Sequence, residues 1–172
     1  MIDYYSMSAA EAEAALPALA ELVIDAVDSG ASIGFMPPLA EADALAYWHD
    51  VIAALRDGSR ILLVAAEAGV IQGSVQLGLE KRANGQHRCE AMKLFVHRRA
   101  RRRGIARELM TEAESAARAA GCTLMLMDTR KGGEADQLCQ TLGYEAYGEV
   151  PGYARSGNGE LHTTVFYYRK LG

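Results

Sequence analysis

A basic turn at residues 97–104 is the stretch of this sequence best suited to chemistry. An extended segment precedes the turn and an amphipathic helix follows it. The first backbone N–H groups of a helix have no intrahelical partner, and the helix dipole adds positive potential there. Gly104 and the small Ala106 allow a phosphate to approach the backbone. We therefore expect the turn to bind a diphosphate, with formal charge supplied by Arg98, Arg99, Arg101, Arg102 and Arg103.

The elements on either side of the turn must position it. Residues 89–96 are predicted to form a strand, and the helix after the turn carries apolar residues at helical spacing from Ile105 until Gly121, a suitable C-terminal stop. Residues 122–129 are a second apolar run of strand length. A strand, a helix and a strand in this order form a βαβ unit, so we expect the two strands to be parallel.

The N-terminal half supplies more of the predicted core. Its elements are an edge strand at 1–7, a helix from Ser8 that breaks at Pro17, a helix at about 40–57, and strands at 61–66 and 71–79. Ser8 and Glu11 form a capping box, and proline disfavours a helix interior. The continuous apolar run at 61–66 predicts burial on both faces, whereas the alternating run at 71–79 predicts one buried face.

The C-terminal part adds a short helix after Gly132-Gly133 and two more strands. The strands are expected at 144–150 and 161–169, joined across Pro151-Gly152-Tyr153 and the turn at 157–159. No repeat, linker or low-complexity segment interrupts the chain. The sequence therefore predicts one domain, residues 1–172, with a mixed α/β (α+β) sheet and helices on both faces.

Composition excludes several classes of protein. The 172 residues are 50% hydrophobic and 23% charged, with a net charge of −4, so the basic turn is a local feature of an acidic chain and a nucleic-acid partner is not expected. The absence of a long apolar run or a signal-peptide pattern predicts no membrane partner and a cytoplasmic location. The three cysteines and four histidines have no metal-ligand spacing, so no metal is expected.

The motif Arg101-x-x-Gly104-x-Ala106, between a strand and a helix, resembles the Gln/Arg-x-x-Gly-x-Gly/Ala signature of the GNAT acyltransferase superfamily. The order of elements fits that family over nearly the whole chain. The resemblance implies a mostly antiparallel sheet of about seven strands, with one parallel pair that splays apart around the thioester of acetyl-CoA as co-substrate. It also implies cofactor contacts from Leu94, Phe95, Val96, Arg101, Arg102, Arg103, Gly104, Ile105 and Ala106.

Transfer of an acetyl group to an amine needs a neutral nucleophile. Glu90 and Asp128 are acids inside otherwise apolar strands, and the resemblance makes these the strands that open around the thioester. Partial desolvation would raise the pKa of each acid, so that it can accept the ammonium proton directly or through water. The alternative is that one or both form structural ion pairs with Lys93, Arg88 or Arg130.

The group that protonates the leaving thiolate is where the sequence departs from the family. Many members have a tyrosine where Cys139 stands in Ala135-x-x-Leu138-Cys139. Cys139 lies on an apolar stripe, and buried cysteines usually behave as small hydrophobic residues. We favour an inert Cys139, with solvent or another tyrosine, such as Tyr144 or Tyr153, as the proton donor.

Three stretches resemble the tabtoxin-resistance-like branch of the family, which acetylates an amine of a β-lactam toxin. They are Gly30–Met36, Asp128-Thr129, and the segment from Glu149 through His162 to Tyr168. This resemblance implies an N-acetyltransferase of a small-molecule amine, with β-lactam or amino-acid-like toxins among the candidate acceptors. Phe35 and Tyr153 are the expected acceptor-binding residues, whereas Trp48 lies on a helical apolar stripe and is more readily a core residue.

Two other functions stay open at this point. A peptide or protein Nα-acetyltransferase would need an open acceptor channel. A non-catalytic acyl-CoA-binding regulatory module would keep Gly104 and the arginines but would need neither Glu90 nor Asp128. A homodimer is common in the family, but no surface of this sequence identifies an interface.

Overall fold

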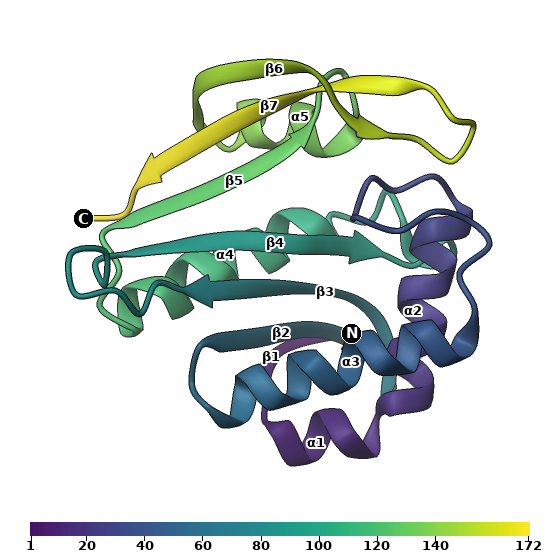
Figure 1. Cartoon of the computed structure of the whole chain (residues 1–172). Coiled ribbons are helices and arrows are strands. Elements are labelled where there is room, and N and C mark those ends of the chain that lie inside the picture. Colours follow the sequence, from purple (N-terminus) through teal and green to yellow (C-terminus); the bar gives the residue numbers. More distant parts are fainter.

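One seven-stranded sheet takes strands from the whole length of the chain. The computed structural model describes all 172 residues, and the order of its strands is β1-β2-β3-β4-β5-β7-β6 (Figure 1). The strands are β1 (Ile2–Met7), β2 (Arg60–Glu67), β3 (Val70–Leu79), β4 (Arg88–Val96), β5 (Leu124–Arg130), β6 (Glu145–Arg155) and β7 (Leu161–Lys170). Every neighbouring pair is antiparallel except β4 and β5. The predicted mixed, mostly antiparallel sheet is confirmed.

The parallel pair separates soon after it begins. Its register contains only the pairs Arg88–Leu124, Cys89–Met125 and Glu90–Leu126, so the later parts of β4 and β5 are not hydrogen-bonded to each other. Lys93 has a left-handed backbone (φ 56°), and the β3–β4 register shifts between Ser74 and Gln76 opposite it. This bulge bends β4 where it leaves β5. The predicted splay is therefore present.

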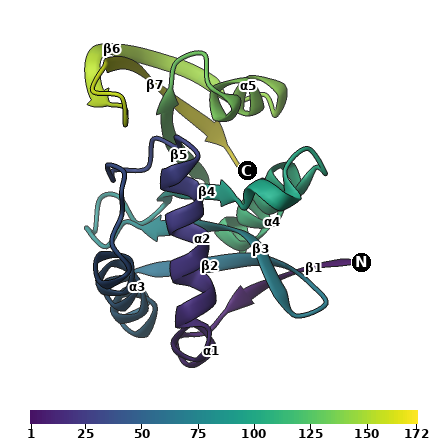
Figure 2. The same ribbon diagram turned by 90° about the vertical axis from the view of Figure 1, so that its right-hand side faces the viewer.

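Helices cover both faces of the sheet. The first face carries α1 (Ala9–Ala14), α2 (Leu16–Asp28) and α3 (Glu41–Arg56), and the second carries α4 (Ile105–Ala119) and α5 (Glu134–Thr141). Figure 2 shows α3 and α4 on opposite sides of the sheet. Leu62 and Val64 of β2 belong to the core under α1–α3, whereas Leu63 and Ala65 belong to the core under α4. Two cores explain the continuous apolar run of this strand.

The N-terminal helix breaks where proline predicts it. The Ser8 backbone N–H donates to Oε2 of Glu11 at 2.7 Å, and the Glu11 N–H donates to the Ser8 hydroxyl at 3.3 Å, which completes the capping box. α1 ends at Ala14, and Pro17 lies in the first turn of α2, where its missing N–H costs no intrahelical bond. None of the helices is both long and apolar enough to cross a bilayer.

The prediction of a half-buried β3 is wrong. The polar residues of β3 are all buried, namely Gln72, Ser74 and Gln76. The reason is that α2 and α3 cover the face that the alternating pattern predicted to be exposed to solvent. Hydrogen bonds compensate for the burial of Gln76, which accepts from Nη1 of Arg60 at 3.0 Å and donates to the Tyr47 hydroxyl at 2.6 Å. The buried Ser74 hydroxyl has no hydrogen-bond partner in the protein. The alternating polar residues of β3 therefore face a helix-covered side of the sheet rather than solvent.

β6 is longer than predicted. Pro151, Gly152 and Tyr153 lie inside the strand instead of ending it. The register with β7 shifts between Val150 and Ala154, so these residues form a bulge on an edge strand, where proline is tolerated. Only the turn between Arg155 and Leu161 joins β6 to β7.

Candidate active site

A cavity of about 690 Å³ lies where β4 and β5 separate, a volume typical of a small-molecule site. Its walls are formed by residues 91–96 of β4, residues 127–130 of β5 with the following loop, the start of α4, and residues 29–33 after α2. Because β4 has lost its partner here, the backbone groups on that edge face the cavity instead of a neighbouring strand. The opening can therefore bind an extended ligand that carries amides.

The end of the cavity at α4 has the geometry of an anion site. Arg102 (φ 60°) and Gly104 (φ 80°) are both left-handed, which turns successive backbone amides towards one side. Gly104 is the N-cap of α4, and the helical hydrogen bonds begin with the Glu108 N–H donating to the Gly104 carbonyl at 3.1 Å. The N–H groups before Glu108 have no helical acceptor. Nothing lies within 4 Å of a β-carbon built at Gly104, so this position is open.

The arginines of the turn have different partners. Arg98 pairs with the buried Asp25 of α2, and Arg99 donates to Glu21 at 2.9 Å. Arg103 forms two hydrogen bonds of 2.8 Å with Glu67 of β2 and does not line the cavity. These three arginines hold the turn to the protein.

Two arginines of the turn line the cavity. Arg101 donates to the Val96 carbonyl at 3.2 Å and to the Ser29 hydroxyl at 2.6 Å. Arg102 is the one arginine of the turn without a hydrogen-bond or ion-pair partner in the protein. The structure thus brings into one cavity Leu94, Phe95, Val96, Arg101, Arg102, Gly104, Ile105 and Ala106, and places Arg103 outside it.

Glu90 and Asp128 lie on neighbouring strands at the closed end of the splay. Glu90 belongs to the last β4–β5 pair, and Asp128 lines the cavity two residues beyond that pair on β5. Desolvation raises the pKa of both carboxyls, and the charge of Asp128 raises the pKa of Glu90 further. Both side chains keep a surface that water can reach, so the effect is smaller than complete burial would produce.

The structural ion pairs considered for these acids are absent. Arg88 donates to Glu80 at 3.0 Å, Arg130 donates to the Ser156 hydroxyl at 3.2 Å, and Lys93 donates to the Ile33 carbonyl. Glu90 and Asp128 therefore form no direct ion pair with these cations, although the nearby charge of Lys93 lowers the pKa of both carboxyls. An unpaired acid beside a cavity is able to take up a proton.

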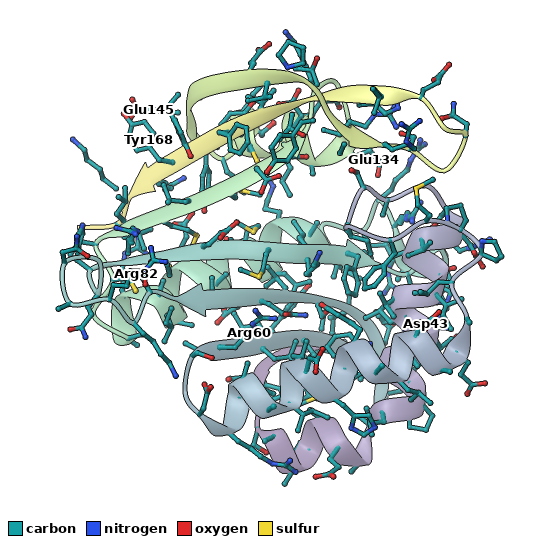
Figure 3. The ribbon with its side chains drawn as sticks, in the orientation of Figure 1. Asp43, Arg60, Arg82, Glu134, Glu145 and Tyr168 are labelled. Atoms are coloured by element: carbon teal, nitrogen blue, oxygen red, sulfur yellow. The ribbon has the colours of Figure 1, made fainter.

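Glu90 also sits in a row of residues that crosses the sheet. Arg60 of β2 lies opposite Gly78, which lies opposite Glu90, and the row continues through Leu126 to Tyr168 of β7. The row ends at Glu145 of β6, and Figure 3 labels Arg60, Tyr168 and Glu145. The Arg60 charge lowers the Glu90 pKa and so opposes the effect of desolvation. Asp128, which lies two residues beyond this row and lines the cavity, receives no such contribution from Arg60.

Lys93 is a site residue that the sequence analysis considered only as an ion-pair partner. Its ammonium lies 5.8 Å from the centre of the Phe35 ring and also binds the Ile33 carbonyl. Burial lowers the pKa of Lys93, while the charges of Asp128 and Glu90 raise it. The sequence feature that could have identified Lys93 as a site residue is its position as the single lysine in the apolar segment from Ala91 to Val96.

The aromatic residues expected at the acceptor, Phe35 and Tyr153, belong to different segments, and neither lines the cavity. Phe35, in the α2–α3 connection, packs edge-on against Tyr47 at 5.2 Å. Tyr153 on β6 is exposed and packs edge-on against Phe166 at 5.3 Å, and Phe166 lies opposite Asp128 in the β5–β7 register. Trp48 is fully buried and donates to the Leu19 carbonyl at 2.7 Å, so its core role is confirmed.

The candidate proton donors to the thiolate differ in their exposure to solvent. Cys139 is buried with its sulfur 3.3 Å from that of Met127, and burial raises its pKa to about 12. This environment supports the inert role. Tyr144 is also buried, and its hydroxyl donates to Glu114 of α4 at 3.1 Å, on the face away from Asp128. Of the tyrosines considered, only Tyr153 has an exposed side chain.

Asp136 is a second residue that the sequence analysis missed. It is buried, accepts a hydrogen bond from the Gly132 N–H at 2.7 Å and accepts another from the Tyr167 hydroxyl. Gly132 lines the cavity, so Asp136 fixes the loop that forms one of its walls. Asp136 and Cys139 are both buried residues of α5. An acid at an inward-facing helix position is the sequence feature that could have identified Asp136.

Comparisons with known proteins agree with this geometry. Residues 25–144 match the model of the acetyltransferase (GNAT) family. An uncharacterised N-acetyltransferase from the hisH–hisA intergenic region of Azospirillum brasilense is 35% identical over 115 residues, which are 66% of this chain and 67% of that protein.

Solved structures share the fold at lower identity. An N-acetyltransferase from Staphylococcus aureus Mu50 superposes with a TM-score of 0.82 at 18% identity, covering 100% of this chain and 99% of that one. The protein yncA from Salmonella typhimurium, solved with its cofactor acetyl-CoA, has a TM-score of 0.79 at 21% identity, covering 99% and 94%. The chain belongs to the acetyltransferase (GNAT) family and is an acyltransferase.

Proposed function

We propose that this protein transfers an acetyl group from acetyl-CoA directly to the primary amine of a small molecule. The observation that carries the proposal is the position of Asp128: an acid without an ion-pair partner, at the closed end of a cavity whose other end is an anion site. The presence of acetyl-CoA in the yncA structure, which has the same fold, supports the choice of co-substrate.

The residues of the cavity fit this co-substrate. A diphosphate would be held by the open amides before Glu108 and by Arg102, and an amide-bearing arm by the unpaired edge of β4 from Leu94 to Val96. When bound, acetyl-CoA supplies an activated acetyl thioester. With the diphosphate of acetyl-CoA at the anion site and its amide-bearing arm along β4, the acetyl group would lie towards Lys93 and Asp128.

Asp128 is the proposed base, with Glu90 as a second acid behind it. A primary amine is mostly protonated near neutral pH and must lose a proton before it attacks. Desolvation raises the Asp128 pKa, which makes its carboxylate a better proton acceptor than an exposed aspartate. Solvent or Tyr153 would protonate the leaving thiolate, because the Cys139 and Tyr144 side chains are buried.

A small acceptor is favoured over a peptide. The β6–β7 turn meets the α2–α3 connection, where a β-carbon built at Gly157 would lie 2.7 Å from Cγ of Pro37, and Figure 1 shows the two segments side by side. This contact supports a small acceptor. The resemblance to the tabtoxin-resistance-like branch makes β-lactam and amino-acid-like amines the first acceptors to test.

The test is a panel of primary amines, including amino-acid amides and β-lactam amino acids, with detection of the free thiol of released CoA. We expect turnover with at least one small amine and loss of that turnover in Asp128→Asn, with acetyl-CoA binding retained by calorimetry. Acetyl-CoA binding without turnover on any amine, or Asp128→Asn at full activity, would overturn the proposal.

A further inference from the structure

Two segments that are distant in sequence meet over the splayed strands. One is the α2–α3 connection, and the other is the β6–β7 turn. A β-carbon built at Gly157 in the turn would lie 2.7 Å from Cγ and 3.0 Å from Cδ of Pro37 in the connection. Figure 1 shows the tip of the β6–β7 hairpin beside that connection. Only glycine fits at position 157 without displacing the rigid proline ring.

Each of the two segments is attached to a different splayed strand. Lys93 of β4 donates to the Ile33 carbonyl and lies over the Phe35 ring, which holds the α2–α3 connection. Arg130 of β5 donates to the Ser156 hydroxyl at 3.2 Å, which holds the turn. Both Lys93 and Arg130 line the cavity. Lys93, Ile33–Pro37, Ser156-Gly157 and Arg130 thus form an arch that spans the gap between β4 and β5.

The turn that forms one side of the arch is stiffened by its own hydrogen bonds. The Gly159 N–H donates to the Ser156 carbonyl at 2.8 Å, the Ser156 N–H donates to the Glu160 carbonyl at 2.8 Å, and Arg155 donates to the Gly159 carbonyl at 2.6 Å. On the other side, Ile33 is buried in the core under α2 and α3. Neither side can move far without breaking these contacts.

We propose that the Pro37–Gly157 contact at the crown of this arch is a specificity determinant that limits the size of the acceptor amine. The proposal rests on the proposed function. Asp128 lines the cavity that this arch spans. Its partner in the β5–β7 register is Phe166, and the Phe166 ring packs against the Tyr153 ring. An acceptor whose amine reaches Asp128 must fit beneath the crown, so a bulky substituent near the amine collides with Pro37 and Gly157.

The substitution Gly157→Ala tests this inference directly. Gly157 does not have a left-handed backbone, so alanine changes only the space at the crown. The added carbon pushes the two sides apart, and the ratio of kcat/KM for a bulky amine to that for a small amine rises by about tenfold, the effect of roughly one methylene in a shaped pocket. Pro37→Ala alone also raises the ratio, because it removes the ring that a bulky substituent meets at the crown.

Gly148→Ala is the matched control. Gly148 lies in the same hairpin, on β6, and nothing lies within 4 Å of a β-carbon built there. We expect its selectivity ratio to equal that of the wild type. An unchanged ratio in Gly157→Ala, or an equal change in Gly148→Ala, would contradict the role of the crown.

A second measurement does not depend on turnover. In the protein without ligands, hydrogen exchange at the Ser156 and Gly159 amides should speed up in Gly157→Ala and not in Gly148→Ala, because the turn loses its seat on Pro37. Unchanged exchange in Gly157→Ala contradicts the inference. A wild-type protein that acetylates no amine would instead overturn the proposed function, so the two failures are distinguishable.

Discussion

Asp128 lies two residues beyond Leu126, the last residue of β5 that pairs with β4, and its negative charge raises the pKa of Glu90, the β4 partner of Leu126. Two carboxyls that repel each other in this way resist simultaneous ionisation. Asp128 lines the cavity and Glu90 does not, so only Asp128 is placed to contact a ligand there. The first predictions follow from this asymmetry.

Asp128→Asn should lower kcat by between about 10²-fold and 10⁴-fold, the usual contribution of a positioned base. The amide keeps the shape of the side chain but cannot accept the ammonium proton. Steady-state kinetics on an accepted amine measures the effect. Asp43→Asn, on the exposed first turn of α3, is the control and should leave kcat unchanged. A smaller loss in Asp128→Asn than in Glu90→Gln would reverse the assignment of the base.

The same substitution should stabilise the protein at neutral pH. Desolvation raises the Asp128 pKa above its ordinary value of 3.8, although the Lys93 charge opposes the shift. Folding therefore disfavours the ionised carboxyl, and this penalty is present above the folded pKa and disappears at low pH. Thermal melts should show Asp128→Asn above the wild type at pH 7 and equal to it at pH 3. An equal difference at both pH values would refute the explanation.

Lys93→Met should move the acidic limb of the rate profile to higher pH. The Lys93 charge lowers the Asp128 pKa, so its removal lets that pKa rise. A profile of kcat/KM against pH measures the change, and Lys93→Arg should restore the wild-type limb. The control is Lys131→Met, because Lys131 lines the same cavity but pairs with Glu149 at 2.6 Å. A limb that stays in place would show that Lys93 acts only on the arch.

Arg102 and Arg103 should behave differently although they are adjacent. Arg102→Ala should weaken CoA binding by about tenfold, since a hydrogen bond to a charged group contributes on the order of 1.5 kcal/mol. Arg103→Ala should leave CoA binding unchanged and lower the stability of the protein only slightly, as expected for a solvent-exposed ion pair. Calorimetry and urea unfolding measure the two effects. Equal loss of affinity in both variants would contradict the assignment.

Tyr167→Phe should lower the free energy of unfolding by about 1–3 kcal/mol, because it leaves a buried carboxylate short of a donor. Burial alone would raise the pKa of Asp136, yet hydrogen bonds from Tyr167 and the Gly132 N–H lower it. The stabilisation is therefore present at neutral pH and is lost as pH falls through the folded pKa. Urea unfolding at pH 7 and pH 3 tests this, with the exposed Tyr153→Phe as the control.

The sequence predicts the fold well because the order of elements and the apolar periods determine it. The helix break at Pro17, the parallel pair and the splay are all confirmed. One error arises where a residue satisfies its polar groups inside the protein: the pattern predicted a solvent-facing Gln76, which instead bonds to Arg60 and Tyr47. The other arises at a bulge: the sequence predicted that Pro151 lies in a loop, whereas it lies within β6.

The site was predictable only where backbone geometry follows from local sequence. Gly104 and the start of α4 show this, because a strand, a glycine turn and a helix fix their own geometry. The partners of Arg103 and Lys93 are different. Glu67 is 36 positions from Arg103 and Ile33 is 60 positions from Lys93, so only the tertiary fold reveals these contacts.

The ion pairs of Arg98, Arg99 and Arg103 have a consequence for the speed of ligand exchange. They fasten the basic turn to α2 and β2 before any ligand arrives. The conformational entropy of that loop is therefore lost during protein folding, and the proposed diphosphate ligand would meet a preorganised site. Its arrival and its departure should then be limited by diffusion and desolvation rather than by reshaping of the loop.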